Sequence, residues 1–202
     1  MNKALSFSAT ILATAIALSG CAGTTSGAGA SGGSMPGMDH SSTGQSSASA
    51  AADHNGTDTM FAQGMIPHHA QAVEMSEMML KKQGIDAKVT ALAGRIKAAQ
   101  GPEIDRMTGW LQRWNEPAQM PGGHTMSGML GDDELKKLDA ASGTDASKLF
   151  LTQMIAHHEG AVEMANAEVR GGKDPEAISL ARNVAASQTD EIKEMKELLA
   201  GL

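Results

Sequence analysis

The segment Met65–Met75, which reads MIPHHAQAVEM, decides the fold because the chain contains it twice. Residues Met154–Met164 read MIAHHEGAVEM and are identical to it at all but three positions. After a slip of one residue the similarity continues through these aligned pairs: Asp86 and Asp174, Leu92 and Leu180, Gln100 and Gln188, Glu103 and Glu191, and Met107 and Met195. A match over about 45 residues indicates an internal duplication, and each copy carries two adjacent histidines.

The duplicated unit is predicted to be a hairpin of two long helices. Aromatic residues make up 2% of the chain and methionine occurs 15 times, a composition that favours helices over strands. Helical spacing of apolar residues, with Asp58 and Asp174 as N-cap candidates, predicts long helices at about 58–82, 86–114, 145–171 and from 174 onward, and a short one near 132–140. The sequence therefore predicts an all-α four-helix bundle built by duplicating a helical hairpin.

The first 20 residues are predicted to be a lipoprotein signal peptide. Lys3 precedes an apolar stretch over residues 5–18 that is too short for a transmembrane helix. Leu18-Ser19-Gly20-Cys21 resembles a bacterial lipobox, so we expect export and a lipid on Cys21 that anchors the protein at the outer face of the cell membrane or in the periplasm. An ordinary secretory signal with an incidental cysteine is the alternative. Cys21 is the only cysteine, which excludes an internal disulfide and a thiolate metal site.

The rest of the chain divides into a tether and one domain. Residues 21–56 are rich in Gly, Ser, Ala and Thr, which is typical of a flexible tether. Residues 57–202 are expected to form the bundle, with repeat one at 57–116, a Met-rich linker at 117–144 and repeat two at 145–202. A net charge of −7 without a basic run argues against nucleic-acid binding.

The predicted inner faces of the helices carry polar residues. In repeat one, His69 lies near the middle of the apolar face and His68 toward its edge, and His158 and His157 hold the same positions in repeat two. The partner helices add these residues to their own apolar faces: Gln100, Glu103, Gln188 and Glu191. Buried polar groups are costly unless they are paired, so something must compensate for these side chains.

Three arrangements would compensate for the buried polar groups. In the first, His69 and His158 pair with Glu103 and Glu191, and the two glutamines cap a closed network. In the second, the side chains hold a metal; imidazole suits copper, zinc, iron and nickel, while thioether selects copper(I). In the third, the helix ends are wet enough for the polar groups to reach water.

Methionine is the feature that favours copper over other metals. Met65 and Met154 lie one helical turn before the histidine pairs. Two further groups of soft and imidazole ligands, one in the tether and one in the linker, are candidate accessory metal sites: Met35, Met38 and His40, and Met120, His124, Met126 and Met129. Thioethers have no proton to lose, so they can hold copper(I) even in an acidic medium. For the tether group, accidental composition is the alternative.

The doubled HHxxAVEM motif, the Met-Ile before each histidine pair, and the segments beginning at Gln100 and Gln188 resemble the bacterial family called domain of unknown function 305 over residues 57–200. The resemblance implies a ferritin-like four-helix bundle, usually exported, with some members associated with copper binding and copper tolerance. The family's histidine pairs and preceding methionines map onto these residues: His68, His69, His157, His158, Met65 and Met154. Gly122 and Gly123 stand where members often have further methionine.

These features together predict an exported, lipid-anchored protein that sequesters or delivers copper. His69 and His158 are the expected primary ligands, His68 and His157 secondary ones, and Glu103 and Glu191 orient the rings or bind directly, while Met65 and Met154 supply soft character. We expect no enzyme, because no catalytic constellation is present and the Glu-x-x-His spacing of di-iron bundles is missing. The rival hypothesis is a metal-free envelope interaction module whose His, Glu and Gln network is structural.

Overall fold

Helices form almost all of the computed structural model, which describes residues 53–120 and 126–202. The helices are α1 (Gly56–Lys81), α2 (Ala87–Trp114), α3 (Asp132–Ala140), α4 (Gly143–Gly171) and α5 (Pro175–Ala200). The predicted signal peptide, Cys21 and most of the tether lie outside the described residues. Within the described ranges, no helix has the length and apolar character needed to cross a membrane.

The start of α1 depends on Asn55, because its side chain accepts hydrogen bonds from the backbone N–H groups of Thr57 (2.8 Å) and Asp58 (3.2 Å). Asp58 returns the interaction by accepting from the Asn55 backbone N–H at 2.6 Å, which completes a capping box. The helix therefore begins two residues earlier than expected, and the prediction that Asp58 is the N-cap is wrong. Asp86 and Asp174 cap α2 and α5 as expected.

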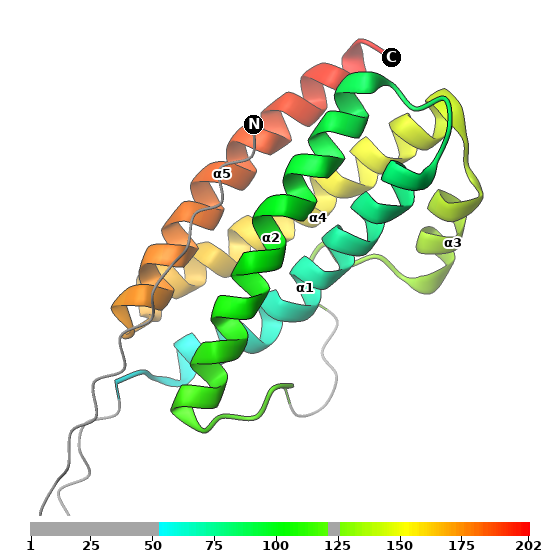
Figure 1. The fold of residues 1–202 in the computed structure, drawn as a ribbon. Helices are drawn as coiled ribbons and strands as arrows, with labels where there is room; N and C mark the ends of the chain where they lie inside the picture. Colours follow the sequence, from blue (N-terminus) through cyan, green and yellow to red (C-terminus); the bar gives the residue numbers. More distant parts are fainter. Residues whose placement is uncertain (1–52, 121–125) are drawn as a thin grey trace, which may run out of the picture. The chain divides into compact units, whose positions relative to one another are not determined.

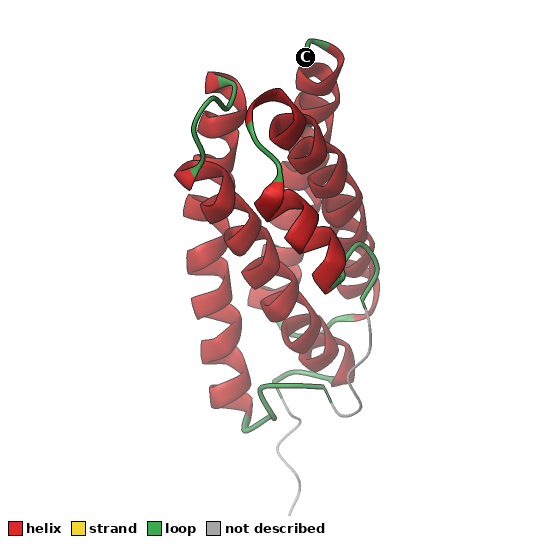
Figure 2. Cartoon of the chain, turned by 90° about the vertical axis from the view of Figure 1, so that its right-hand side faces the viewer, coloured by secondary structure: helices red, strands yellow, loops and turns green. Residues whose placement is uncertain are grey.

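The four long helices form a bundle of two hairpins (Figure 1). Helix α1 packs along α2, α4 packs along α5, and the hairpins meet through α1 and α4. The short α3 contacts both α1 and α4, and lies across the front of the bundle in Figure 2. The predicted all-α four-helix bundle is confirmed, and the two histidine-bearing helices are neighbours.

A polar layer divides the hydrophobic core into two clusters. One cluster is built around Met75, Ile96 and Phe150, and the other around Phe61, Met107 and Leu180. Between the two clusters, every long helix carries polar residues on its inner face, and we call these residues the polar layer: His68, His69, Gln100, Glu103, His157, His158, Gln188 and Glu191. Because each repeat supplies one histidine pair and one Gln/Glu pair at the same height, the duplication builds this layer.

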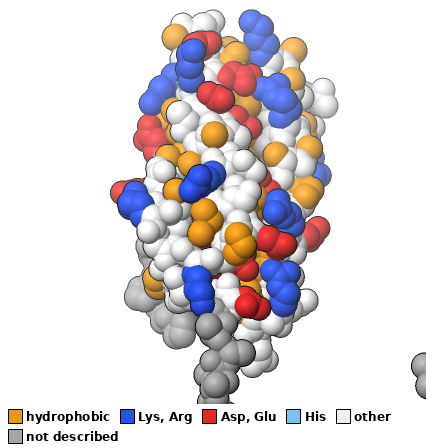
Figure 3. All heavy atoms as spheres, turned by 90° about the vertical axis from the view of Figure 1, so that its left-hand side faces the viewer, with side chains coloured by type: hydrophobic (Ala, Val, Ile, Leu, Met, Phe, Trp, Pro, Cys, Tyr) orange, Lys and Arg blue, Asp and Glu red, His pale blue; other side chains and the backbone are white. Residues whose placement is uncertain are grey.

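Exposed ion pairs join neighbouring helices on the surface. Arg95 of α2 pairs with Glu194 of α5, and Lys97 of α2 pairs with Glu77 of α1. Figure 3 shows basic and acidic side chains interspersed on the face that carries α5, without a continuous patch of either sign. Exposed pairs of this kind contribute little to stability, so the core and the polar layer hold the fold.

Candidate functional site

The two repeats form the same histidine–glutamate pair. His69 Nε2 donates to Glu103 Oε2 at 2.8 Å, and His158 Nε2 donates to Glu191 Oε2 at 2.8 Å. Both rings are fully buried, while the glutamate side chains are 21% and 20% exposed. Each carboxylate fixes the proton of its partner ring on Nε2, which leaves Nδ1 with a free lone pair.

The other two histidines of the polar layer meet at the contact between α1 and α4. The rings of His68 and His157 have centroids 3.7 Å apart and are tilted by 38°. His68 Nε2 donates to the backbone carbonyl of Ser127 at 3.2 Å, so its Nδ1 is also the unprotonated nitrogen. The ring contact between the hairpins therefore involves the histidines expected at the edge of the apolar face, rather than His69 and His158.

The polar layer contains buried atoms without hydrogen-bond partners. They are the Nδ1 atoms of His68, His69, His157 and His158, Nε2 of His157, and Oε1 of Gln100 and Gln188. The expected capping of the network by the two glutamines is therefore not formed through these oxygens. Buried groups of this kind are uncommon in folded proteins and require an explanation, such as an ion that they bind.

Burial keeps the central histidine pair neutral. Desolvation lowers the pKa of His68 to about 4, although the Ser127 carbonyl opposes the shift. The pKa of His157 is lowered to about 2, mainly by desolvation and to a smaller extent by the neighbouring His68. Neutral imidazole is the form that binds metals, so these rings stay competent as ligands in mildly acidic surroundings.

A covering loop, residues 126–131, lies over the central histidine pair. The side chain of Gln71 holds it by donating to the Leu130 carbonyl (3.0 Å) and accepting from the Leu130 backbone N–H (2.8 Å). Gly160 lets the loop approach α4, because a Cβ there would come within 2.0 Å of the Ser127 carbonyl oxygen. No role was predicted from the sequence for Gln71 or Gly160. The two residues occupy equivalent positions and form one of the three differences between the repeated motifs.

The predicted methionine ligands separate into distinct places. Met65 and Met154 are fully buried, and they belong to different core clusters on either side of the polar layer. Met120 and Met126 lie near Gly64 on α1, and Met129 closes a turn with Met126. Four of the predicted residues lie outside the described ranges: Met35, Met38, His40 and His124.

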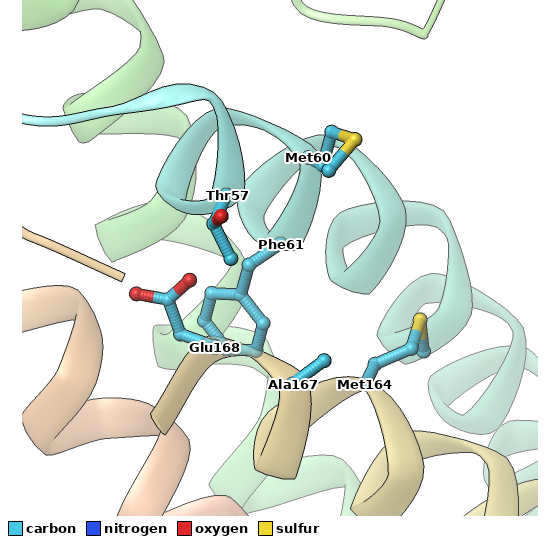
Figure 4. Close-up of a pocket in the computed structure, with 6 residues that line it drawn as sticks. All are labelled: Thr57, Met60, Phe61, Met164, Ala167 and Glu168. Carbon is cyan, nitrogen blue, oxygen red and sulfur yellow. The ribbon is translucent and has the colours of Figure 1, made fainter. Parts of the chain in front are cut away.

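A second polar cluster, also missed in the sequence, joins the two hairpins at the start of α1. Asp58 accepts backbone hydrogen bonds from Lys173 (2.9 and 3.1 Å) and Asp174 (2.9 Å). Fully buried Glu168 lines a pocket of about 130 Å³ (Figure 4). Burial and the neighbouring Asp58 raise the pKa of Glu168 to about 8, so it is largely protonated at neutral pH.

The charged and imidazole side chains do not by themselves enclose an ion. Within residues 53–120 and 126–202, no group of three or more His, Cys, Asp or Glu side chains is arranged to hold a metal. The layer instead offers four imidazole Nδ1 atoms that have no hydrogen-bond partner.

The family described as Domain of unknown function (DUF305) matches residues 58–199. A DUF305 protein of Streptomyces coelicolor that is described as secreted is 36% identical over 72% of this chain and 93% of its own, with a TM-score of 0.68. A DUF305 fragment from Deinococcus radiodurans is 32% identical over 73% of this chain and 98% of its own, with a TM-score of 0.67.

A third similar structure is that of the protein CopM in a Cu(I)-bound form, at 32% identity over 71% of this chain and 96% of its own, with a TM-score of 0.61. CopM structures with Cu(II) and with Ag, and without metal, are similar as well. None of these proteins is described as an enzyme. No curated protein matches the chain. The match over 58–199 and the similar structures show that the chain belongs to the DUF305 family.

Proposed function

We propose that this protein binds copper through the histidines of the polar layer and sequesters or delivers it outside the cytoplasm. The observation that carries the proposal is the set of four buried Nδ1 atoms without partners, on rings whose Nε2 protons are fixed for His69, His158 and His68. Histidines that bind metals usually donate their other N–H to a carboxylate or a carbonyl. The pattern of donors in this layer is therefore that of oriented metal ligands.

The residues of the layer fit copper as cargo. His69 and His158 would bind through Nδ1, with Glu103 and Glu191 holding the rings, and the central pair of His68 and His157 would add further nitrogens. Met65 and Met154, buried one helical turn before the histidine pairs, would supply soft thioether donors that favour copper(I). Copper supplies no chemistry here beyond its binding.

The similar structures support copper as the metal and a place outside the cytoplasm. CopM is found with Cu(I), Cu(II) and Ag, and the Streptomyces coelicolor relative is described as secreted. For this chain we propose a signal peptide over residues 1–20, a lipid on Cys21 and a tether over residues 21–56 that holds the bundle near the membrane.

A competition titration with copper(I) and copper(II) tests the proposal. The full chain would be compared with His69→Gln/His158→Gln, because glutamine can still donate a hydrogen bond to Glu103 and Glu191. His54→Gln is the matched control, since His54 stacks on Trp114 away from the layer. We expect tight binding that the double variant loses and the control keeps. Equal copper affinity in all three proteins would refute the histidine site.

One observation favours a second function, a metal-free interaction module. The His69–Glu103 and His158–Glu191 hydrogen bonds are formed without a metal, as a purely structural network requires. This function predicts that His69→Ala, which removes the hydrogen-bond donor to Glu103, lowers the free energy of unfolding and that added copper changes nothing. A thermal melt of the full chain with and without copper separates the two functions, because a ligand that binds the folded state raises Tm.

A further inference from the structure

Three methionines converge on one glycine of α1, one helical turn before His68. A Cβ at Gly64 would lie 3.2 Å from the sulfur of Met126, 3.5 Å from the sulfur of Met164 and 3.8 Å from the terminal methyl of Met120. Met164 belongs to α4, whereas Met120 and Met126 belong to the chain between α2 and α3. Side chains from two separate parts of the chain therefore meet over the bare backbone of Gly64.

The glycine makes this meeting possible. Any side chain at position 64 would fill the space in which the two sulfur atoms lie. The equivalent position in repeat two is Gln153, whose amide donates to the Glu134 carbonyl, so the second repeat has no such space. Met60, one helical turn before Gly64, lies on the same face of α1 and is 58% exposed. Figure 4 shows Met60 and Met164 at the end of the pocket opposite Glu168.

Packing alone accounts poorly for these methionines. Methionine often fills irregular gaps in a core, as the fully buried Met75 and Met79 do here. Met120, Met126 and Met164 are instead partly exposed, and Met164 is the counterpart of buried Met75. A pocket of about 420 Å³ lined by Met120, Met126 and Pro67 leads to the group. The sulfur atoms are thus gathered and accessible.

We propose that Met126 and Met164, with Met120, form a thioether site for a soft monovalent metal ion, copper(I) or silver(I), with Gly64 as its floor. Thioether sulfur is a neutral, polarisable donor that selects copper(I) over zinc, magnesium or calcium. The chain's negative charge favours the approach of a cation. The site uses none of the histidines of the polar layer, so the protein holds a second, proton-independent set of ligands for the metal.

The test is a silver(I) titration of the full chain labelled at its methionine methyl groups, followed by NMR. Silver(I) is a redox-stable probe for a copper(I) site. Met126→Leu and Met164→Leu serve to assign the signals and to remove ligands while roughly conserving side-chain volume. Met78→Leu is the matched control, because Met78 is a partly buried methionine of α1 that lies away from Gly64. Histidine ring signals recorded in the same samples report on the polar layer separately.

We expect the Met126 and Met164 methyl signals to shift with silver(I) in the parent and in the control, and one bound equivalent to disappear in each ligand variant. Gly64→Leu should abolish the same equivalent by filling the floor of the site. Histidine signals that respond in every variant would show that the two sites are independent. Methyl signals of Met126 and Met164 that stay unchanged at saturating silver(I), or an unchanged number of bound equivalents in the ligand variants, would overturn the proposal.

Discussion

Repeat one and repeat two place the same histidine–glutamate pair in the bundle but surround it differently. His69–Glu103 and His158–Glu191 have equal hydrogen-bond lengths of 2.8 Å and similarly exposed carboxylates. The differences lie in the next turn of the histidine helices, where Gln71 stands in repeat one and Gly160 in repeat two. The duplication therefore preserves the centre of the layer and varies the positions that meet the covering loop.

That variation has a physical reason, because one loop cannot contact two identical surfaces in the same way. Gln71 holds Leu130 with two hydrogen bonds, while Gly160 gives the Ser127 backbone room to approach. The loop can then offer the Ser127 carbonyl to His68 and leave His157 without a partner. The covering loop therefore contacts the two repeats differently. As a result, His68 and His157 also differ in their hydrogen bonds.

Two further equivalent positions have diverged along the same helices. Met75 and Met79 of repeat one are core residues, whereas their counterparts in repeat two are Met164, beside Gly64, and Glu168, beside Asp58. Two apolar core positions of repeat one are therefore occupied in repeat two by a partly exposed methionine and a buried acid. The layer is where the copies agree, which supports a function located there.

The largest effect is expected for Gly160→Ala, which would prevent the covering loop from approaching α4 in repeat two. The new Cβ would meet the Ser127 carbonyl oxygen at 2.0 Å, so the loop has to move off α4. We expect a loss of about 3 kcal/mol in the free energy of unfolding, at the upper end for overpacking, measured by urea denaturation. Gly94→Ala is the control, since a Cβ there meets nothing within 4 Å, and it should stabilise α2. Similar stability changes in the two variants would mean that the loop does not depend on Gly160.

The next effect concerns Glu168, which replaces the Met79 of repeat one. Because the pKa of Glu168 is raised from 4.5 to about 8, the folded state keeps a proton that the unfolded state releases. The stabilisation is complete below about pH 4.5 and is lost as the pH rises to about 8. Glu168→Gln keeps a donor to Asp58 but cannot ionise. Its unfolding free energy should lack this decline between pH 5 and 8; an identical pH profile for both proteins would contradict a protonated Glu168.

The smallest effect tests whether the two halves of the layer are equivalent. Glu103→Ala and Glu191→Ala each remove the acceptor of one buried histidine N–H, and water can reach part of the space because the carboxylates are partly exposed. We expect a loss of about 1 kcal/mol in each variant, equal within error by urea denaturation. A clearly larger loss in one of them would show that the covering loop makes the two pairs unequal.

The sequence predicted most of the fold because the relevant signals are local. Asp86 and Asp174 cap helices in the expected places, and helical periodicity puts His69 and Glu103 on inner faces that the bundle brings together. The duplication then implied the second pair. These inferences require only spacing along a helix and the cost of burying a polar group.

The remainder depended on contacts between distant segments. Gly160 matters because the Ser127 backbone approaches it closely, and Gly64 matters because Met126 and Met164 converge on it. Helical periodicity in the sequence reveals neither contact. Asp58 was read as a helix cap because Asp is common there, while its contacts with the backbone at Lys173 and Asp174 come from 115 residues or more along the chain.

The central claim, that the histidine layer binds copper through Nδ1, is tested most directly by nitrogen-15 NMR of the imidazole rings of the full chain as copper(I) is added. We expect the Nδ1 signals of the layer histidines to move on metal binding. The Nε2 atoms of His69 and His158 should stay protonated and bonded to Glu103 and Glu191. Nδ1 signals that remain unchanged when copper(I) is saturating would contradict the account and leave the layer as a structural network.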